Sequence, residues 1–322
     1  MNPEKPLDVY LGLDVGSVST KLAALDQDGG LLASLYSRTQ GHPIAAIQKG
    51  LAEIRDRLPA GAAIRGVGTT GSARELAGVI VGADIVKNEI TSQAVAALRH
   101  VPEARTIIEI GGQDSKIIIL RDGVVVDFGM NTVCAAGTGS FLDHQALRLK
   151  MEIGEFGPRA LRSRNPVRIA GRCTVFAESD MIHKQQMGHP VEDILYGLCQ
   201  ALVRNYLNNI GSGKEIRPPV VFQGGVAFNQ GMVRALRESL ETEIIVPPHH
   251  EVMGAIGAAL IGLENARAAG NGTRFLGFGV VGKHYEAASF ECPHCANHCE
   301  IARISSEGTS LACWGGRCDR WN

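Results

Sequence analysis

The sequence predicts an α/β protein built from two related domains, and three observations support this prediction. The chain has 322 residues, which suits two domains of ordinary size better than one small core. It contains 39 glycines but only 5% aromatic residues, as expected when many tight turns join strands and helices. One strand–turn–strand pattern also occurs twice, in residues 8–35 and 106–129, which indicates one structural unit used twice.

The overall composition excludes several classes of partner. The net charge is −1, which gives no electrostatic bias toward nucleic acid or an anionic membrane. No apolar run is long enough to span a bilayer, and the N-terminus lacks the basic and apolar regions of a signal peptide. We therefore expect a cytoplasmic protein that binds neither nucleic acid nor membranes. Its eight cysteines are then free thiols, metal ligands or catalytic groups.

The first copy of the repeat, DVYLGLDVGSVSTKLAALDQDGGLLASL, contains a turn suited to binding phosphate. Short residues let backbone N–H groups approach an anion closely, and the hydroxyl and ammonium groups add donors. Asp14, at the end of the first strand, is placed to hold a metal ion through water and is a predicted catalytic residue. The residues predicted to bind the nucleotide here are Gly16, Ser17, Val18, Ser19, Thr20 and Lys21.

The second copy, TIIEIGGQDSKIIILRDGVVVDFG, repeats the order of acid, glycine, serine and lysine, with Glu109 in the place of Asp14. Gln113 and Asp114 are predicted catalytic residues, because either could position an attacking water. The residues predicted to bind the nucleotide here are Gly111, Gly112, Gln113, Ser115 and Lys116. Two such loops facing each other would hold the β- and γ-phosphates and Mg²⁺ between two domains. The alternative is a chance coincidence of common patterns, which the shared order of residue types argues against.

A third glycine-rich segment is VVFQGGVAFNQGMVRALRESL, residues 220–240. A strand runs into Gly224 and Gly225, and an amphipathic helix follows. Such a turn allows close approach of the backbone to a base or ribose, so Gly224, Gly225 and Asn229 are predicted to bind the nucleotide. The alternative is a packing turn.

Five segments in a fixed order carry a resemblance to a known family. DVGSVSTK, EIGGQDSK, CAAGTGSFLD, CTVFAES and FQGGVAFN resemble those of the ATP-dependent activators of 2-hydroxyacyl-CoA dehydratases and of the ATPase subunits of benzoyl-CoA reductase. These proteins belong to the superfamily of acetate kinase, sugar kinases, Hsp70 and actin. The resemblance implies two duplicated actin/Hsp70-like, ribonuclease H-like domains. Each would contain a mixed five-stranded sheet that begins with a three-stranded meander, with ATP or ADP and Mg²⁺ in the cleft between the domains.

The resemblance also implies a homodimer with one 4Fe–4S cluster shared between its subunits. The family's cluster cysteines match Cys134 and Cys173, each of which precedes a probable helix whose N-terminus suits an anionic group. ATP would drive transfer of one low-potential electron, received from ferredoxin or flavodoxin, into a partner iron–sulfur protein. The alternative for either thiol alone is a buried structural cysteine, which is what we expect for Cys199. Further residues placed near the nucleotide are Gly137, Thr138, Gly139, Asp143 and Glu178.

The C-terminal tail departs from the family. Its spacing is C-x2-C-x3-C-x13-C-x4-C, formed by Cys292, Cys295, Cys299, Cys313 and Cys318. These thiols predict a tetrahedral zinc site or a second iron–sulfur cluster, and the alternative is a set of unliganded thiols. With few core residues, the tail needs a metal or a partner surface to fold, and the stretch before the cysteines predicts a linker and one strand. The tail leaves two acceptors open, an acyl-CoA dehydratase or a reductase with a double-cubane cluster.

We expect domain limits near 1–105 and 106–265, followed by a tail from 266 to 322. Two other functions remain alternatives to an ATP-hydrolysing electron donor. One is a small-molecule kinase of the same superfamily, although the sequence offers no carboxylate base beside a sugar pocket, and Cys134 and Cys173 would then have no purpose. The other is a regulatory ATPase that binds zinc through its tail.

Overall fold

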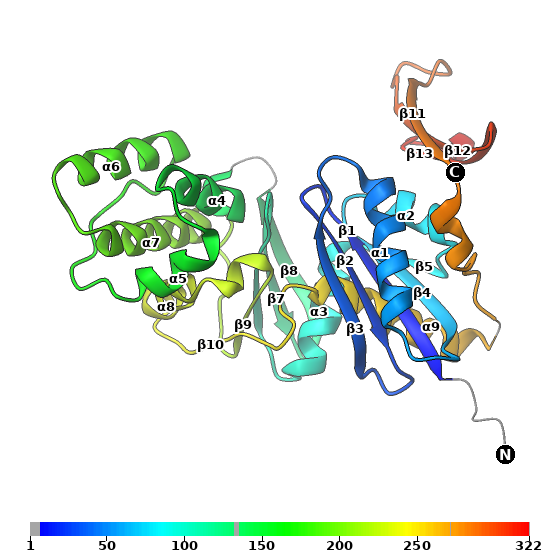
Figure 1. The fold of residues 1–322 in the computed structure, drawn as a ribbon, viewed down its shortest axis with the longest axis horizontal. Coiled ribbons are helices and arrows are strands. Elements are labelled where there is room, and N and C mark those ends of the chain that lie inside the picture. The colour runs from blue at the N-terminus through cyan, green and yellow to red at the C-terminus, as the bar shows by residue number, and fades with distance from the viewer. Residues whose placement is uncertain (1–6, 132–134, 271, 322) are drawn as a thin grey trace. The chain divides into compact units, whose positions relative to one another are not determined.

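The computed structural model describes residues 7–131, 135–270 and 272–321 (Figure 1). The chain forms two compact units: one contains the residues up to Ser92 and those from Gly254 onward, and the other contains Gln93–Met253. These units differ from the expected limits, because residues 93–105 fall in the second unit and residues 254–265 in the first. No helix within the described ranges has the length and apolar character needed to cross a membrane.

The first unit is built on a five-stranded sheet with the order β3-β2-β1-β4-β5. Strands β1 to β3 form an antiparallel meander, and β4 and β5 continue the sheet in parallel. Buried residues of α1 and α2 pack on one face of this sheet, and α9 lies close to the other face. The elements are β1 (Asp8–Val15), β2 (Ser19–Leu25), β3 (Leu31–Arg38), α1 (Pro43–Arg57), β4 (Ala63–Thr70), α2 (Arg74–Val81), β5 (Ile85–Val86), α3 (Glu89–His100, at the unit boundary) and α9 (Met253–Ala269).

Glycines explain why α9 lies so close to the strands. A Cβ atom added at Gly12 would lie 1.9 Å from the carbonyl oxygen of Ala255, and one at Gly68 would lie 2.1 Å from that of Ala258. Both strand positions therefore need glycine, because helix backbone occupies the space that a side chain would fill.

The second unit repeats this topology with the order β10-β9-β6-β7-β8. Strands β6, β7 and β8 form the antiparallel meander, and β9 and β10 are parallel to β6. The prediction of two related five-stranded mixed sheets is therefore confirmed. The elements are β6 (Thr106–Ile110), β7 (Ser115–Arg121), β8 (Val124–Asn131), η1 (Ala135–Gly137), α4 (Gly139–Arg148), α5 (Ile153–Ala160), α6 (Thr174–Gln186), α7 (Val191–Asn209), β9 (Val220–Gln223), η2 (Gly225–Phe228), α8 (Gln230–Leu240) and β10 (Ile244–Ile245).

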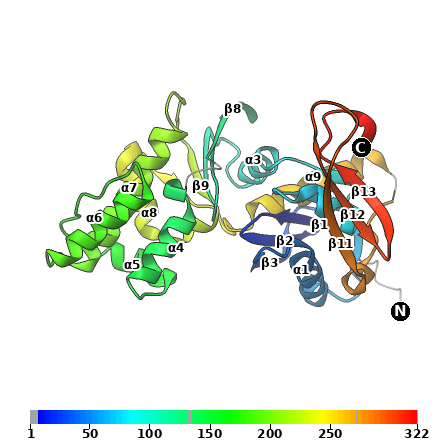
Figure 2. The same cartoon turned by 90° about the horizontal axis from the view of Figure 1, so that it is seen from above.

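The C-terminal tail belongs to the first unit and contains a third sheet. Figure 2 shows its strands β11 (Tyr285–Glu291), β12 (Glu300–Ser306) and β13 (Thr309–Trp314) side by side, and they pair in antiparallel fashion. The short helices η3 (Phe278–Gly282) and η4 (Asp319–Trp321) flank this sheet. One strand was expected here and is present as β11, whereas β12 and β13 were not predicted from the sequence.

The tail packs against the body through apolar contacts and hydrogen bonds. Val280, Tyr285 and Ile304 are buried in the core of the first unit. The side-chain amide of Gln48 on α1 donates to the carbonyl oxygens of Val280 and Lys283, at 3.0 and 2.7 Å. The first unit thus provides the surface that so small a segment needs in order to fold.

Candidate nucleotide and metal sites

The loop between β1 and β2 is a tight turn with an acid–lysine pair at its base. The N–H of Gly16 donates to the carbonyl oxygen of Ser19 at 3.0 Å, which closes the turn. Asp14 lies opposite Lys21 across the two strands, and the Lys21 Nζ lies 3.1 Å from the Asp14 Oδ2. The backbone groups of residues 16–19 are therefore presented beside a buried carboxylate.

The buried hydroxyl of Thr20 supports this turn through Thr39. Its Oγ1 lies 2.9 Å from that of Thr39, and the Thr39 hydroxyl donates to the carbonyl oxygen of Gly16 at 2.8 Å. Thr20 was predicted to contact the nucleotide, and here it forms part of the support of the turn.

The loop between β6 and β7 repeats this geometry. The N–H of Gly111 donates to the carbonyl oxygen of Asp114 at 3.0 Å. Lys116 lies opposite Glu109, and its Nζ is 3.0 Å from the Glu109 carboxylate and 2.8 Å from that of Asp114. Gln113 lies at the exposed tip of this turn. The predicted second loop thus has the same framework as the first, with an additional carboxylate on its lysine.

Tyr206 of α7 supports the second loop from the core. Its hydroxyl donates to the carbonyl oxygen of Lys116 at 2.8 Å. Burial raises the pKa of this hydroxyl well above its ordinary value, and the nearby Glu109 raises it further. Tyr206 therefore remains a neutral donor, and it holds β7 against the helical layer.

Two buried hydroxyls near these loops have no hydrogen-bond partner within the described residues, namely those of Thr70 and Ser115. Thr70 ends β4 beside Asp14, and Ser115 begins β7 directly after the second loop. Buried polar groups are nearly always paired, so an orphaned hydroxyl points to a missing ligand or water. Thr70 was not predicted. The signal available in the sequence was the threonine–glycine step at the end of a strand. In the structure, Gly71 has a φ of +97°, which favours glycine.

The GTG part of the CAAGTG segment is bonded directly to the second loop. The N–H groups of Gly139 and Ser140 donate to the carbonyl oxygens of Gly111 and Gly112, each at 2.8 Å. The Thr138 hydroxyl donates to the carbonyl oxygen of Ala135 at 2.9 Å. The first turn of α4 is therefore hydrogen-bonded to the loop predicted to bind phosphate.

The third glycine segment packs on the end of β6. A Cβ atom at Gly224 would lie 2.5 Å from the Ile110 carbonyl oxygen and 2.9 Å from the Glu109 carboxylate, so only glycine fits. Gly225 begins η2. The Asn229 Oδ1 caps α8 by accepting from two backbone N–H groups, while its Nδ2 is buried without a partner among the described residues.

Cys173 stands where a helix N-terminus begins, as predicted, because it is the residue directly before α6. Cys134 lies outside the described residues, but the two alanines that follow it are described. Ala136 and Cys173 line one narrow void, and Ala135 and Thr174 line a larger cavity beside it. The segments that carry the two predicted ligands therefore approach each other.

Asn205 of α7 lies between these two segments. Its Nδ2 donates to the carbonyl oxygens of Gly171 and Arg172, at 2.6 and 3.3 Å, just before Cys173. Its Oδ1 is so close to the CAAGTG loop that a Cβ atom at Gly137 would lie 3.1 Å from it. Asn205 was not predicted as a site residue, since nothing in the neighbouring sequence distinguishes one asparagine within a helix.

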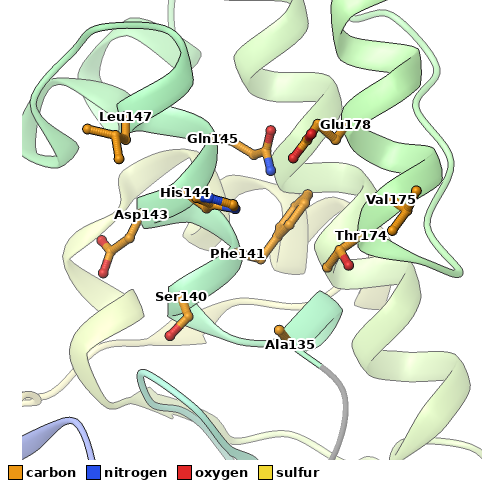
Figure 3. A pocket seen from close by; sticks show the side chains of 10 residues that line it. All are labelled: Ala135, Ser140, Phe141, Asp143, His144, Gln145, Leu147, Thr174, Val175 and Glu178. Atoms are coloured by element: carbon orange, nitrogen blue, oxygen red, sulfur yellow. The ribbon is translucent and has the colours of Figure 1, made fainter.

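A cavity of about 580 Å³ lies between α4 and α6 (Figure 3). Asp143 on α4 and Glu178 on α6 both line it, and an ion pair joins Glu178 to Arg148 at 2.6 Å. The buried Oε1 of Gln145 has no partner among the described residues. The two predicted acids therefore border the same cavity as the residues next to the cysteines.

The remaining cysteines range from fully buried to exposed. Cys199 is fully buried in the core of the second unit, as predicted, and burial raises the pKa of its thiol. In the tail, Cys292 is buried while Cys295 and Cys318 are exposed. Within the described ranges, no three histidine, cysteine or acidic side chains are already arranged to hold a metal ion.

Two sheets of the same order, each with a glycine turn and an acid–lysine pair, define an ATPase of the actin/Hsp70-like fold. The chain belongs to the BadF/BadG/BcrA/BcrD ATPase family, whose match covers residues 11–262. The family resemblance and the fold inferred from the sequence are therefore both confirmed. Residues beyond 262, including the whole tail sheet, lie outside this match.

Curated relatives and a solved structure agree with this assignment. The 2-hydroxyisocaproyl-CoA dehydratase activator of Clostridioides difficile is 35% identical over 269 residues, covering 80% of this chain and 96% of the relative. The (R)-2-hydroxyglutaryl-CoA dehydratase activating ATPase of Acidaminococcus fermentans is 34% identical, covering 81% and 99%. The structure of the Clostridium difficile activator with bound ADPNP superposes with a TM-score of 0.74 at 34% identity, covering 81% of this chain and 97% of that one.

Proposed function

We propose that this protein is an ATP-dependent activator that donates one electron to a partner iron–sulfur enzyme. The acceptor would be a 2-hydroxyacyl-CoA dehydratase or a reductase with a double-cubane cluster, and ferredoxin or flavodoxin would supply the electron. The observation that carries the proposal is the approach of the segment after residue 134 to Cys173, beside a loop bonded to the phosphate-binding turn. A small-molecule kinase would need no such pair of cysteine segments.

The nucleotide would be held by the two glycine turns. Their backbone N–H groups and the ammonium groups of Lys21 and Lys116 suit the β- and γ-phosphates, and the orphaned hydroxyls of Thr70 and Ser115 would gain partners. Asp14 would hold Mg²⁺ through water. Gln113, at the exposed tip of the second turn, would orient the attacking water.

Cys134 and Cys173 of each of two protomers would ligate one shared 4Fe–4S cluster, which when bound would carry the transferred electron. The N–H groups at the start of α6 would stabilise the negative charge beside the Cys173 thiolate. Asn205 would fix the spacing of the two segments, because it is hydrogen-bonded to the segment before Cys173 and packs against Gly137.

A surface suited to the second protomer is available on α6. Val175 is 67% exposed and Phe176 is 65% exposed, and both directly follow the cysteine segment. Ile182 and Met187 further along the chain are also exposed. Exposed apolar side chains gathered in this way are typical of an interface, and a homodimer would bury them around the cluster.

A change in the bound nucleotide would alter the position of the cluster ligands through α4. Closure of the second loop on ATP pulls on the carbonyl oxygens of Gly111 and Gly112, which are bonded to the N–H groups of Gly139 and Ser140. The segment before α4 then shifts relative to α6. ATP can favour that arrangement only by binding it more tightly than the other state, and hydrolysis then resets it.

Anaerobic purification with iron and sulfide counted per dimer tests the proposal. The unsubstituted protein should contain four irons and four sulfides per dimer, as expected for one 4Fe–4S cluster. Cys173→Ser should lose them while still binding ATP, because the glycine turns are unchanged. Cys199→Ala is the matched control, since that thiol is buried in the core and should leave the iron content intact. A full iron complement in Cys173→Ser would remove Cys173 from the ligand set.

A further inference from the structure

The tail sheet brings four of its five cysteines to one end. The sequence spacing alone could not show which of the five lie together. The pairing of β11 with β12 ends at Glu291 and Glu300, so Cys292 and Cys299 face each other just beyond it. The N–H of Cys292 donates to the carbonyl oxygen of Cys299 at 2.8 Å. Cys295 lies in the connection between them, where the N–H of His298 donates to its carbonyl oxygen at 3.2 Å and closes a tight turn.

The segment after β13 returns Cys318 to the same end. A Cβ atom at Gly315 would lie 2.6 Å from the Glu300 carbonyl oxygen, so this segment runs against the start of β12. A Cβ atom at the next residue, Gly316, would lie 3.2 Å from the Cys318 carbonyl oxygen and 3.4 Å from the indole ring of Trp321. The segment from Gly315 to Trp321, which contains Cys318, therefore lies at the same end of the sheet as Cys292 and Cys299.

Cys313 is the exception. It lies within β13 opposite Arg303, four residues along β12 from Cys299. A strand rises by roughly 3.3 Å per residue, so the Arg303–Cys313 pair lies about 13 Å along the sheet from the facing Cys292 and Cys299. Sulfur atoms that share one ion must each lie about 2.3 Å from it, so Cys313 cannot join the others without rearrangement of the sheet.

The surroundings of Cys292 resemble those of a metal-bound thiolate. Its side chain is 4% exposed, and its Sγ accepts a hydrogen bond from the indole Nε1 of Trp321 at 3.2 Å. The Trp321 ring packs edge-on against Phe290, with ring centroids 5.0 Å apart. Hydrogen bonds to a ligating atom and an apolar cover are the features that orient ligands and limit access of water at metal sites.

We propose that Cys292, Cys295, Cys299 and Cys318 bind one zinc ion, and that Cys313 is not a ligand. The Cβ atoms of directly opposed strand residues lie about 4.5–5.5 Å apart, a spacing from which two thiolates reach one ion. Cys295 and Cys318 are exposed, so their side chains can turn toward it. The thiols are not gathered in advance, and metal binding would complete the folding of this end of the sheet.

Zinc content of the full-length chain tests this assignment separately from the iron count. The unsubstituted protein and Cys313→Ser should each retain one zinc ion per chain, whereas Cys295→Ser and Cys318→Ser should lose it. Both of these positions are exposed, so their substitution does not disturb the core. Absence of zinc from the unsubstituted protein, or equal loss in Cys313→Ser, would overturn the proposal, as would iron in place of zinc in the tail.

The two tryptophans of the chain give a second readout, because both lie in the tail, at Trp314 and Trp321. Addition of Co²⁺ to the metal-free Cys173→Ser protein, which lacks the proposed cluster, should produce the visible bands of a tetrahedral thiolate site. Tryptophan emission should change over the same titration, since Trp321 donates to the Cys292 sulfur. Cobalt bands that persist in a Cys173→Ser/Cys318→Ser protein would contradict the ligand set.

Discussion

The two units share one sheet topology but differ in what connects the meander to the parallel strands. In the first unit, β3 is joined to β4 by α1 and short turns, across a segment that is described throughout. In the second unit, the equivalent connection from β8 to β9 carries η1, α4, α5, α6 and α7. Cys134 and Cys173 both fall in this longer connection. In the proposed function, nucleotide binding therefore belongs to the duplicated framework, and the candidate cluster site belongs to the longer connection of one copy.

The loops themselves can be aligned residue by residue. The bond from Gly16 to Ser19 matches that from Gly111 to Asp114, and the Asp14–Lys21 pair matches Glu109–Lys116. Four differences follow from this alignment: Ser17 corresponds to Gly112, Val18 to Gln113, Ser19 to Asp114, and Thr20 to Ser115. The second copy thus loses one hydroxyl and gains an amide, a carboxylate and an unpartnered hydroxyl. We propose from this asymmetry that the second loop contributes more of the chemistry and the first loop mainly holds the nucleotide.

The largest effect should come from removing the lysine of the second loop. Lys116 is 3% exposed and contacts two carboxylates, whereas Lys21 is 18% exposed. Lys116→Met leaves a buried carboxylate uncompensated and should lower the free energy of unfolding by about 3–5 kcal/mol. Lys21→Met should cost less, about 1.5–3 kcal/mol.

Urea unfolding followed by circular dichroism, with ATP absent, measures both values. The transition that Lys116→Met shifts should be that of the second unit. Equal losses in the two variants would mean that the loops are energetically alike, and the proposed asymmetry would then rest on Gln113 and Ser115 alone.

The second-largest expected difference between the two loops is their effect on the rate of ATP hydrolysis. Gln113→Ala should lower the turnover number for ATP hydrolysis by about 10²-fold, the lower end of what a positioned catalytic group contributes. The Michaelis constant should change little, because water is oriented mainly in the transition state. Val18→Ala, at the matching position of the first loop, should leave turnover near its original value. Steady-state phosphate release measures both, and unchanged hydrolysis in Gln113→Ala would exclude its role.

Local sequence patterns were sufficient where neighbours along the chain make the structure. The acid and the lysine of each loop are seven residues apart, and a short turn between two strands brings that spacing into register. The order of turn residues therefore predicted the repeat and its loops. Thr70 and Asn205 could not be found in this way, because their importance depends on partners brought close only by the fold. The tail strands were missed for a related reason, since β12 and β13 gain their stability by packing against the first unit.

The smallest predicted effect distinguishes the matched hydroxyls of Thr20 and Ser115. The Thr20 hydroxyl is bonded to Thr39, so Thr20→Val should lower the free energy of unfolding by about 1 kcal/mol. The Ser115 hydroxyl is buried without a partner in the described part of the chain, so Ser115→Ala should leave the stability of the nucleotide-free protein unchanged or slightly raised. The effect of Ser115→Ala should appear only when nucleotide binds, as a roughly fivefold to tenfold weaker affinity for ADP. This estimate follows because a net hydrogen bond contributes about 1 kcal/mol. Calorimetric titration with ADP and thermal unfolding of both variants give the four values. If Ser115→Ala loses stability without nucleotide and keeps its affinity, the hydroxyl has a structural partner and the second loop is no more open to the ligand than the first.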